Sequence, residues 1–513
     1  MSTMAVPTRL RTTAHPVVYE VNIRVLLGEL SRAAGHPVDL GTIPDHVVDG
    51  WADLGFDAIW LMGVWSTGPL GREIARTDPR LVNEYHRALP DLIDDDIGGS
   101  PYAITEYVVP KARGGEEGLT RIRRRLAERG MGLILDFVPN HTARDAPWVL
   151  EHPEYYIAGQ PGDEIERPRE FFSVKSKTRQ VILAHGRDPI FPPWTDTAQL
   201  NIFAASLRQA LIERLRSVAA RCDGVRCDMA MLLLQDIFSR TWSAVLGPEQ
   251  MTAQTGEFWK EVIGAVRSDW PQFLFLAEAY WNREWDLQQL GFDYTYDKVL
   301  YDRLLREGAS ATRDHLKADP RFQRRSVRFI ENHDEHRAAR QLSTEEWHCA
   351  AALIASTIPG MVLFHEGQLE GWTAKLPVQL LRRMPEPGSD RIRMFYRRML
   401  ECLQDPVFRQ GQWLMLEQKP AWQENPSWEN FLAFVWHDQG LGTRLVVVNY
   451  APHSGQCYIS LPEGLLASNI LEFKDLLGPA SYVRDRAGIL SRGMYFDLPG
   501  YGCHLFDLKS PRK

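Results

Sequence analysis

Short apolar runs recur along the chain, and stretches with helical spacing separate them. The runs are VVYEVNIRVLL near residue 20, FDAIWLMGV near 60, MGLILDFV near 135, CDGVRCDMA near 226, FLFLAEAY near 276, SVRFIENHD near 330 and GMVLFHEG near 364, with FDYTYD near 294 as the candidate for a missing sixth strand. Between two of them, Leu119, Ile122 and Leu126 repeat at helical spacing and Gly130 ends the helix. Apolar runs joined by helices are typical of parallel strands. The pattern therefore predicts an α/β fold, a TIM (β/α)8 barrel.

Two regions of the chain depart from this pattern. Residues 141–199 are rich in Pro, Gly and charge and are too long for a loop, which predicts a small domain inserted after the third strand. After Leu403, short alternating strands replace the helices, which predicts a C-terminal antiparallel β-sandwich domain. We therefore expect the barrel in residues 1–140 and 200–403, the inserted domain in 141–199 and the C-terminal β domain in 404–513.

Charge and composition limit the partners of the chain. Acidic residues outnumber basic ones by 66 to 59, and the formal net charge of −7 argues against a nucleic-acid-binding surface. The start of the chain has no apolar stretch of signal-peptide length, and no later run of about 18 apolar residues indicates a membrane span, so we expect a cytoplasmic protein. The six cysteines are scattered without a C-x-x-C pair, which predicts free thiols and no zinc site. The oligomeric state is not indicated by any of these patterns.

Several of the apolar runs end abruptly in polar or acidic residues. In a parallel barrel the active site lies at the carboxyl ends of the strands, so residues at those ends are candidates for function. They are Asp136, Asn140 and His141 in LILDFVPNH, Arg226 and Asp228 in CDGVRCDMA, Glu278 after FLFLA, and Asn332, His333 and Asp334 at the end of SVRFIENHD.

Arg226 and Asp228 are two residues apart, so on a strand their side chains share one face while Cys227 points towards the helix layer. A neighbouring Arg lowers the pKa of a carboxyl group and keeps it ionised, which suits a nucleophile. A purely structural ion pair is the alternative for these two residues. For Cys227 we expect a packing role.

Glu278 follows the apolar residues FLFLA, so its carboxyl group should be poorly solvated and its pKa raised towards neutrality, as in a general acid. A helix cap or an ion pair with an Arg is the alternative. His333 and Asp334 by themselves would indicate a structural hydrogen bond. Three acidic groups at three strand ends, however, can together cleave a glycoside: one attacks the anomeric carbon, one protonates the leaving oxygen, and one faces the positive charge of the transition state.

Four strings resemble the sequence blocks of the alpha-amylase superfamily of retaining glycoside hydrolases, glycoside hydrolase family thirteen. They are DFVPNH from Asp136 to His141, GVRCD from Gly224 to Asp228, AEA from Ala277 to Ala279 and ENHD from Glu331 to Asp334. Their order, strand context and spacing match the family from Tyr19 to about Trp372, and the expected layout of three domains also resembles it. Any one block is a weak signal, but four in order are a strong one.

The resemblance implies that Asp228 is the nucleophile, Glu278 the acid/base and Asp334 the transition-state stabiliser. It implies that the subsite for the transferred sugar is lined by Asp136, His141, Arg226 and His333. Tyr102, in GSPYAITEY, is similar to the family tyrosine that stacks on this sugar, with an ordinary loop aromatic as the alternative. The expected partner is an alpha-linked glucoside, and no cofactor is required for the chemistry.

The chain departs from the family pattern at several positions. Met231 and Leu232 stand where many amylases carry Lys and His, which suggests an atypical acceptor side. Gln199 replaces the acid of an aspartate-Leu-Asn block, and His365 stands where a Tyr is common. Asn140 matches a calcium ligand of the family, but one Asn does not define a site of six or more oxygens, so structural calcium stays open.

The sequence leaves several functions open. The first is a hydrolase acting on alpha-glucosidic bonds of oligosaccharides or disaccharides, as an alpha-glucosidase does. The second passes the glucosyl group to another sugar or to phosphate, as a transglycosidase, a trehalose-synthase-like isomerase or a sucrose-phosphorylase-like enzyme. A non-catalytic relative is disfavoured because all three acids are present. A metallohydrolase using His141 and His333 is disfavoured because YEVNIRV lacks the H-x-H that such a barrel needs.

Overall fold

The computed structural model describes residues 13–175, 180–247 and 256–510, and within them eight parallel strands close into a barrel. The expectation that the start of the chain has no signal-like stretch concerns mainly residues 1–12, which lie outside the described residues. In barrel order the strands are β1 (Val17–Asn22), β2 (Ala58–Met62), β5 (Gly132–Phe137), β10 (Gly224–Cys227), β11 (Leu274–Ala277), β12 (Tyr294–Tyr296), β13 (Ser326–Arg328) and β14 (Met361–His365). The predicted sixth strand near residue 294 is confirmed as β12.

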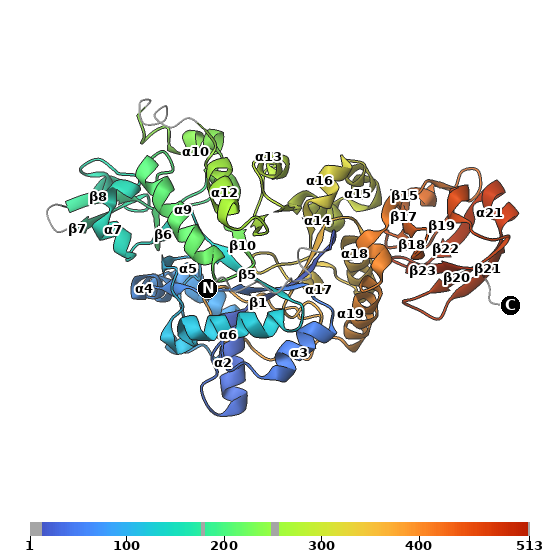
Figure 1. The fold of residues 1–513 in the computed structure, drawn as a ribbon, viewed down its shortest axis with the longest axis horizontal. Helices are drawn as coiled ribbons and strands as arrows, with labels where there is room; N and C mark the ends of the chain where they lie inside the picture. Colours follow the sequence, from blue (N-terminus) through green and yellow to red (C-terminus); the bar gives the residue numbers. More distant parts are fainter. Residues whose placement is uncertain (1–12, 176–179, 248–255, 511–513) are drawn as a thin grey trace.

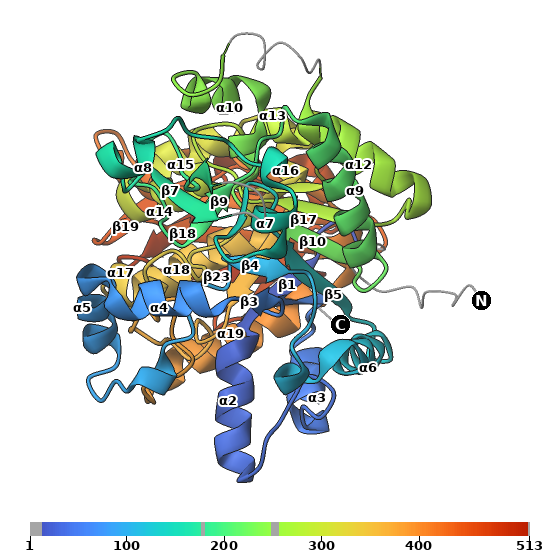
Figure 2. The same cartoon turned by 90° about the vertical axis from the view of Figure 1, so that its left-hand side faces the viewer.

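Helices surround the barrel, as Figure 1 and Figure 2 show. They include α2 (Ile23–Ala34), α3 (Asp45–Asp53), α6 (Gly115–Ala127), α9 (Ala205–Ala219), α12 (Phe258–Asp269), α14 (Lys298–Arg306), α18 (Glu345–Thr357) and α19 (Asp390–Leu403). In α6, the buried face contains Leu119, Ile122 and Leu126, and Gly130 takes a left-handed φ of 77° just after the helix. The predicted helix and its end are therefore confirmed.

The strands alternate between two apolar cores. Val18 and Trp60 pack inside the barrel, whereas Val17 and Ile59 pack in the layer between the strands and the helices. Cys227 belongs to this outer layer, so its predicted orientation is confirmed. Because side chains alternate along a strand, the polar residues on the inner face meet at the carboxyl ends of the strands.

The segment after β5 forms small antiparallel sheets beside the barrel, in the teal part of Figure 1. Strand β6 (His141–Ala143) pairs with β9 (Thr197–Gln199), and β7 (Phe171–Lys175) pairs with β8 (Gln180–Ala184). Both ends of the insertion are thus tied to each other next to the third barrel strand. The domain boundary at residue 141 stays a prediction.

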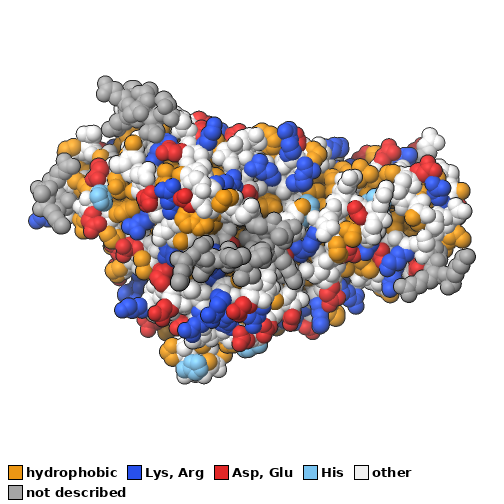
Figure 3. Space-filling model, viewed as in Figure 1, with side chains coloured by type: hydrophobic (Ala, Val, Ile, Leu, Met, Phe, Trp, Pro, Cys, Tyr) orange, Lys and Arg blue, Asp and Glu red, His pale blue; other side chains and the backbone are white. Residues whose placement is uncertain are grey.

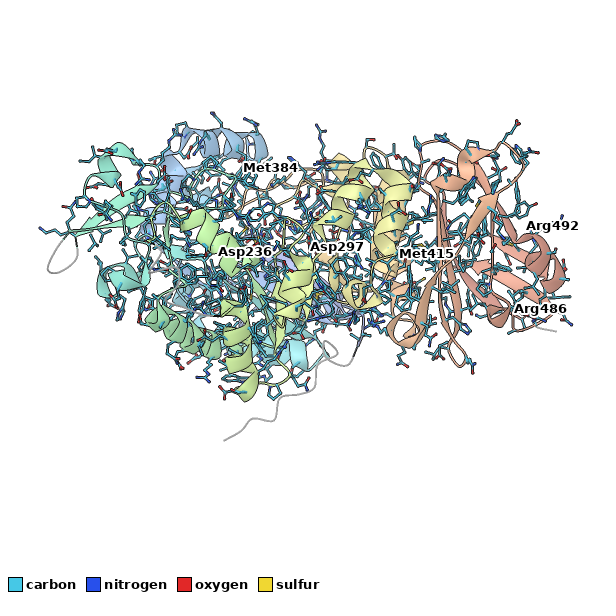
Figure 4. All side chains as sticks on the ribbon, turned by 90° about the horizontal axis from the view of Figure 1, so that it is seen from above. Asp236, Asp297, Met384, Met415, Arg486 and Arg492 are labelled. Carbon is cyan, nitrogen blue, oxygen red and sulfur yellow. The ribbon has the colours of Figure 1, made fainter. Side chains whose placement is uncertain are left out.

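The C-terminal strands form two antiparallel sheets at the opposite end of the molecule from the insertion (Figure 1). The larger has the order β15 (Gln412–Met415), β17 (Phe431–Asp438), β18 (Gly442–Asn449), β23 (Cys503–Lys509), β20 (Ile470–Asp475) and β21 (Ser481–Asp485); the smaller has β16 (Gln418–Pro420), β19 (Gly455–Ile459) and β22 (Met494–Leu498). Figure 4 places Met415 beside the barrel, and Arg486 and Arg492 at the far end. The predicted fold class, a TIM barrel followed by a C-terminal antiparallel β domain, is confirmed.

The surface and the cysteines have simple features. Positive and negative side chains are intermingled on the face in Figure 3. Each of the six cysteines lies in the described part of the chain and is unpaired. Within the described ranges, the helices lack the combination of length and apolar character that a membrane crossing requires.

Candidate active site

A pocket of about 710 Å³ opens at the carboxyl ends of the barrel strands. Its wall includes Asp228, Glu278 and Asp334, which follow β10, β11 and β13. His141, the first residue of β6, and Tyr102, from a loop, also line it. The structure therefore brings the predicted acids together in one cavity, with two of the predicted sugar-binding residues beside them.

Arg226 lies at the centre of the acidic groups and is fully buried. Its Nη1 donates a hydrogen bond of 2.6 Å to Asp228 Oδ1, and its Nη2 forms an ion pair of 2.8 Å with Glu278 Oε2. Asp334 Oδ2 is 4.0 Å from Nη2. One cation thus holds three carboxyl groups near the same point, and the predicted contact between Arg226 and Asp228 is present.

Aromatic rings enclose the Arg226 guanidinium. Its central carbon lies 5.0 Å from the ring centroid of Tyr102, 5.4 Å from that of Trp60 and 5.9 Å from that of Tyr296. The faces of aromatic rings attract cations, and the rings also exclude water. The neighbouring acids, Glu278 first among them, hold the pKa of Arg226 well above its usual value despite its burial. The residue is therefore a permanent buried cation.

Glu278 is 2% exposed, and its carboxyl group has defined partners. Oε2 accepts a hydrogen bond of 2.6 Å from the Met229 amide, and Oε1 accepts one of 3.0 Å from the Tyr280 hydroxyl. Burial raises the pKa of Glu278 to about 7, against the lowering influence of Arg226. This agrees with the pKa expected from the apolar run that precedes the residue, and it places the group where it can both give and take a proton near neutral pH.

Asp334 is the most open of the three acids, with its side chain 42% exposed to the pocket. Its Oδ2 lies 2.9 Å from His333 Nε2. Although burial raises the pKa of Asp334, the neighbouring His333 more than offsets this and holds the pKa well below its usual range. Asp334 therefore remains an anion facing the cavity.

The other predicted site residues lie in two layers. His141 lines the pocket, where its ring lies 5.2 Å from that of Trp194, and burial lowers its pKa. Asp136 lies deeper, 3.9 Å from Arg226, and accepts a hydrogen bond of 3.2 Å from Trp60 Nε1. Burial raises the pKa of Asp136 to about 7. Asp136 thus supports Arg226 from below, whereas His141 faces the cavity.

Tyr102 and His333 stack on each other, with ring centroids 5.4 Å apart and planes 27° from parallel. The Tyr102 hydroxyl lies 2.7 Å from His333 Nε2. Both rings are therefore fixed beside Asp334. The pocket is also lined by Tyr280, Trp281, Phe191 and Trp194, aromatic residues that were not predicted from the sequence.

Two residues that contact the predicted site residues, Glu20 and Tyr280, are not among those predicted from the sequence. Glu20, fully buried on β1, contacts His333 Nδ1 through its carboxyl group. Tyr280 stands two residues after Glu278 in AEAY, so its position past the strand end was a usable signal. The position of Glu20 does not indicate a role in the site, because the residue lies inside an apolar run and 313 positions before His333, which it contacts.

Met231 and Leu232, which stand where many amylases carry Lys and His, do not lie at the acceptor side as expected. Both side chains are buried in the core between strands and helices and do not line the pocket, because a short 3-10 helix, Ala230–Leu233, turns them inward. The pocket is lined at this point by Met229, whose φ of 45° is left-handed. These positions therefore give no evidence of an atypical acceptor side.

The residues around Asn140 do not fit a calcium ion. Gln199 Nε2 donates hydrogen bonds to the Asn140 carbonyl at 2.8 Å, to Asn140 Oδ1 at 3.1 Å and to the Leu200 carbonyl at 3.0 Å. Calcium requires such oxygens as ligands, but here an amide nitrogen occupies the point on which they converge.

The chain resembles known proteins in sequence. The family model of the alpha-amylase catalytic domain matches residues 39–413, well over half of the chain. Alpha-amylase MalA of Haloarcula japonica is 24% identical over 361 residues, which are 69% of this chain and 43% of that protein. The 1,4-alpha-glucan branching enzyme GlgB 1 of Xanthomonas axonopodis pv. citri is 25% identical over 278 residues, 53% of this chain and 31% of that enzyme. The chain thus spans less than half the length of these curated relatives.

Solved structures share the whole fold. The maltogenic alpha-amylase AmyB of Thermotoga neapolitana superposes with a TM-score of 0.68 at 19% identity, covering 97% of this chain and 99% of that one. The alpha-amylase of Geobacillus thermoleovorans, in complex with acarbose, gives a TM-score of 0.65 at 17% identity, with coverage of 97% and 99%. Because the family model matches residues 39–413, which include seven of the eight barrel strands, and residues of the four blocks meet in one pocket, the chain belongs to the alpha-amylase family.

Proposed function

We propose that this protein is a retaining glycosidase that cleaves alpha-glucosidic bonds of oligosaccharides or disaccharides through a covalent glycosyl-enzyme intermediate. The observation that carries the proposal is the shared cation: Asp228 and Glu278 bind the two terminal nitrogens of Arg226 at 2.6 and 2.8 Å. This arrangement keeps the two carboxyl groups close together. Retaining enzymes need a separation of about 5–5.5 Å, whereas inverting enzymes need about 6.5–9.5 Å to admit a water.

Each acid has an environment that suits one step. Asp228 attacks the anomeric carbon, while Glu278 donates its proton to the leaving oxygen; the bond to the leaving group breaks as the bond to Asp228 Oδ forms. With a pKa raised to about 7, Glu278 carries a proton in a large fraction of molecules at neutral pH. In the second step Glu278 takes a proton from a water molecule, whose oxygen attacks the anomeric carbon and releases Asp228 from the sugar. Asp334 remains ionised and stabilises the positive charge that develops on the sugar ring.

A transglycosidase is the second candidate, because the pocket has room and aromatic surface for an acceptor. Its wall carries Tyr280, Trp281, Trp194 and Phe191, and Phe191 is 65% exposed. Sugar rings stack on such faces. An acceptor sugar or phosphate in place of water would give a transglycosidase, an isomerase or a phosphorylase with the same intermediate. The likeness to a branching enzyme supports keeping this candidate.

Product analysis tests the proposal and separates the candidates. Maltose, sucrose, trehalose and maltooligosaccharides are incubated with the enzyme, with and without phosphate, and the products are resolved by chromatography. Free glucose and shorter oligosaccharides alone would support hydrolysis, whereas new disaccharides or glucose 1-phosphate would support transfer. In an NMR time course, the first product should be the alpha anomer; initial beta anomer would contradict the retaining mechanism.

We also infer a cytoplasmic location, which the six unpaired thiols support. Fractionation of cells that express the protein from its own start site tests this inference. Recovery of the protein in the medium would contradict it.

A further inference from the structure

His333 lies between two carboxylates. Its Nδ1 contacts the carboxyl group of Glu20, and its Nε2 lies 2.9 Å from Asp334 Oδ2 and 2.7 Å from the Tyr102 hydroxyl. A neutral imidazole has one N–H and one lone pair, so in that form one ring nitrogen would present a lone pair to a carboxylate. We infer that Glu20 is a positioning residue that keeps His333 doubly protonated, with one N–H directed to Glu20 and the other to Asp334 and Tyr102.

The burial of Glu20 supports this inference. The residue is fully buried in the middle of β1, and its second oxygen, Oε2, has no hydrogen-bond partner in the described residues. An ionised carboxyl group buried without a cation is strongly destabilising. The Glu20 carboxyl group contacts His333, and a charged ring stabilises this buried group more than a neutral ring does.

The other groups around His333 do not reverse this preference. They are Asp136 on β5, Arg226 on β10, His365 on β14, Tyr102 in the loop before β4 (Ile104–Glu106), and Lys375, whose amine donates to the Asp334 backbone carbonyl. Burial and Arg337 hold the pKa of His365 well below its usual value, so that ring adds no charge. Although burial lowers the pKa of His333, Asp334 and Glu20 more than offset it and raise the pKa to about 10.

The double protonation has two consequences for the pocket. The Nε2–H bond fixes the orientation of Asp334 and keeps it anionic. It also makes the Tyr102 oxygen an acceptor, so the Tyr102 proton is free to be donated to a sugar hydroxyl. Glu20 thus acts on the reaction through His333 without touching the substrate. These consequences rest on the proposed function, whereas the charge of His333 does not.

The charge of His333 can be measured directly by NMR. The protein is labelled with 13C at the histidine Cε1 position, and the His333 signal is identified among the 15 histidines by its absence in His333→Gln. In the wild-type protein the signal should keep its imidazolium shift from about pH 6 to pH 9. In Glu20→Gln, which retains an acceptor oxygen but loses the charge, the titration midpoint should fall by about 1–3 pH units.

Glu331→Gln provides a matched control. It also removes a buried carboxylate that contacts a histidine, because Glu331 Oε1 lies 3.1 Å from His365 Nδ1. This variant should leave the His333 midpoint unchanged. If Glu20→Gln does not fold, the wild-type titration decides alone.

A wild-type midpoint near 6.5, or identical midpoints in wild type and Glu20→Gln, would overturn the inference. Activity gives a separate result: Glu20→Gln should lower kcat/KM and Glu20→Asp should restore part of it. Absence of wild-type turnover on any alpha-glucoside would contradict the proposed function but leave the NMR result standing.

Discussion

The Tyr280 hydroxyl should tune the proton affinity of Glu278. Tyr280 Oη donates a hydrogen bond of 3.0 Å to Glu278 Oε1. Burial raises the pKa of Tyr280 well above its usual value, so the hydroxyl keeps its proton and acts as a donor. A donor stabilises the ionised carboxylate and lowers its pKa. Removing the hydroxyl in Tyr280→Phe should therefore raise the pKa of Glu278 above its value of about 7.

The size of the effect follows from the hydrogen bond. A hydrogen bond to a charged group contributes about 1.5–3 kcal/mol, and one pKa unit corresponds to about 1.4 kcal/mol. Taking the lower end, because water can replace part of the lost bond in an open pocket, we expect a rise of about 1 pH unit. Since Glu278 must be protonated to act as the acid, activity is present below its pKa and is lost as the pH rises through it. The variant should therefore stay active to higher pH.

The assay is the pH dependence of kcat/KM on an alpha-glucoside, whose alkaline limb reports the essential acid of the free enzyme. The limb should move upwards by about 1 pH unit in Tyr280→Phe. Tyr107→Phe is the control, because the Tyr107 hydroxyl bonds the Val138 backbone instead of Glu278. An alkaline limb that stays in place or moves to lower pH in Tyr280→Phe would show that the Tyr280 hydroxyl does not lower the pKa of Glu278.

Further predictions concern residues that hold the site together. Chelation of calcium should leave the wild-type melting temperature unchanged, and a melting temperature that falls on chelation would contradict the absence of a calcium site beside Asn140. Gln199→Leu should lower the free energy of unfolding, measured by urea denaturation, by about 1–3 kcal/mol for each oxygen left without a donor. Arg226→Met should destabilise the fold by about 3–5 kcal/mol and abolish turnover, because Asp228 and Glu278 lose their shared cation; a stable, active variant would argue against that role. Cys227→Ala should keep kcat/KM within a few-fold of the wild type, since the thiol packs against the helix layer, and loss of activity without loss of stability would indicate a direct role.

The sequence predicted those parts of the fold that depend on local periodicity. The alternation of Arg226, Cys227 and Asp228 correctly placed the thiol in the outer layer, because side chains on a strand alternate. The apolar run before Glu278 correctly predicted its raised pKa, because burial is a consequence of that run. The eight strands, including the short β12, followed from the same reasoning within the described residues.

The missed features depend on contacts between distant residues or on backbone turns. Glu20 contacts His333 only after the barrel closes, because β1 and β13 both pair with β14. Met231 was expected at the acceptor side because it lies near Asp228 in sequence, but the left-handed turn at Met229 directs it into the core. Neither residue type nor spacing reports such geometry, so the sequence could not supply it.

Covalent attachment of the sugar to Asp228 can be detected by mass spectrometry of the trapped enzyme. A slow fluorinated alpha-glucosyl donor is added to the Glu278→Gln variant, in which the second step should be impaired, and the protein is digested with a protease. We expect one glycosyl adduct, located on Asp228 in the peptide that contains GVRCD. An adduct on another carboxylate, or turnover of the donor with no adduct and with the beta anomer as first product, would contradict it.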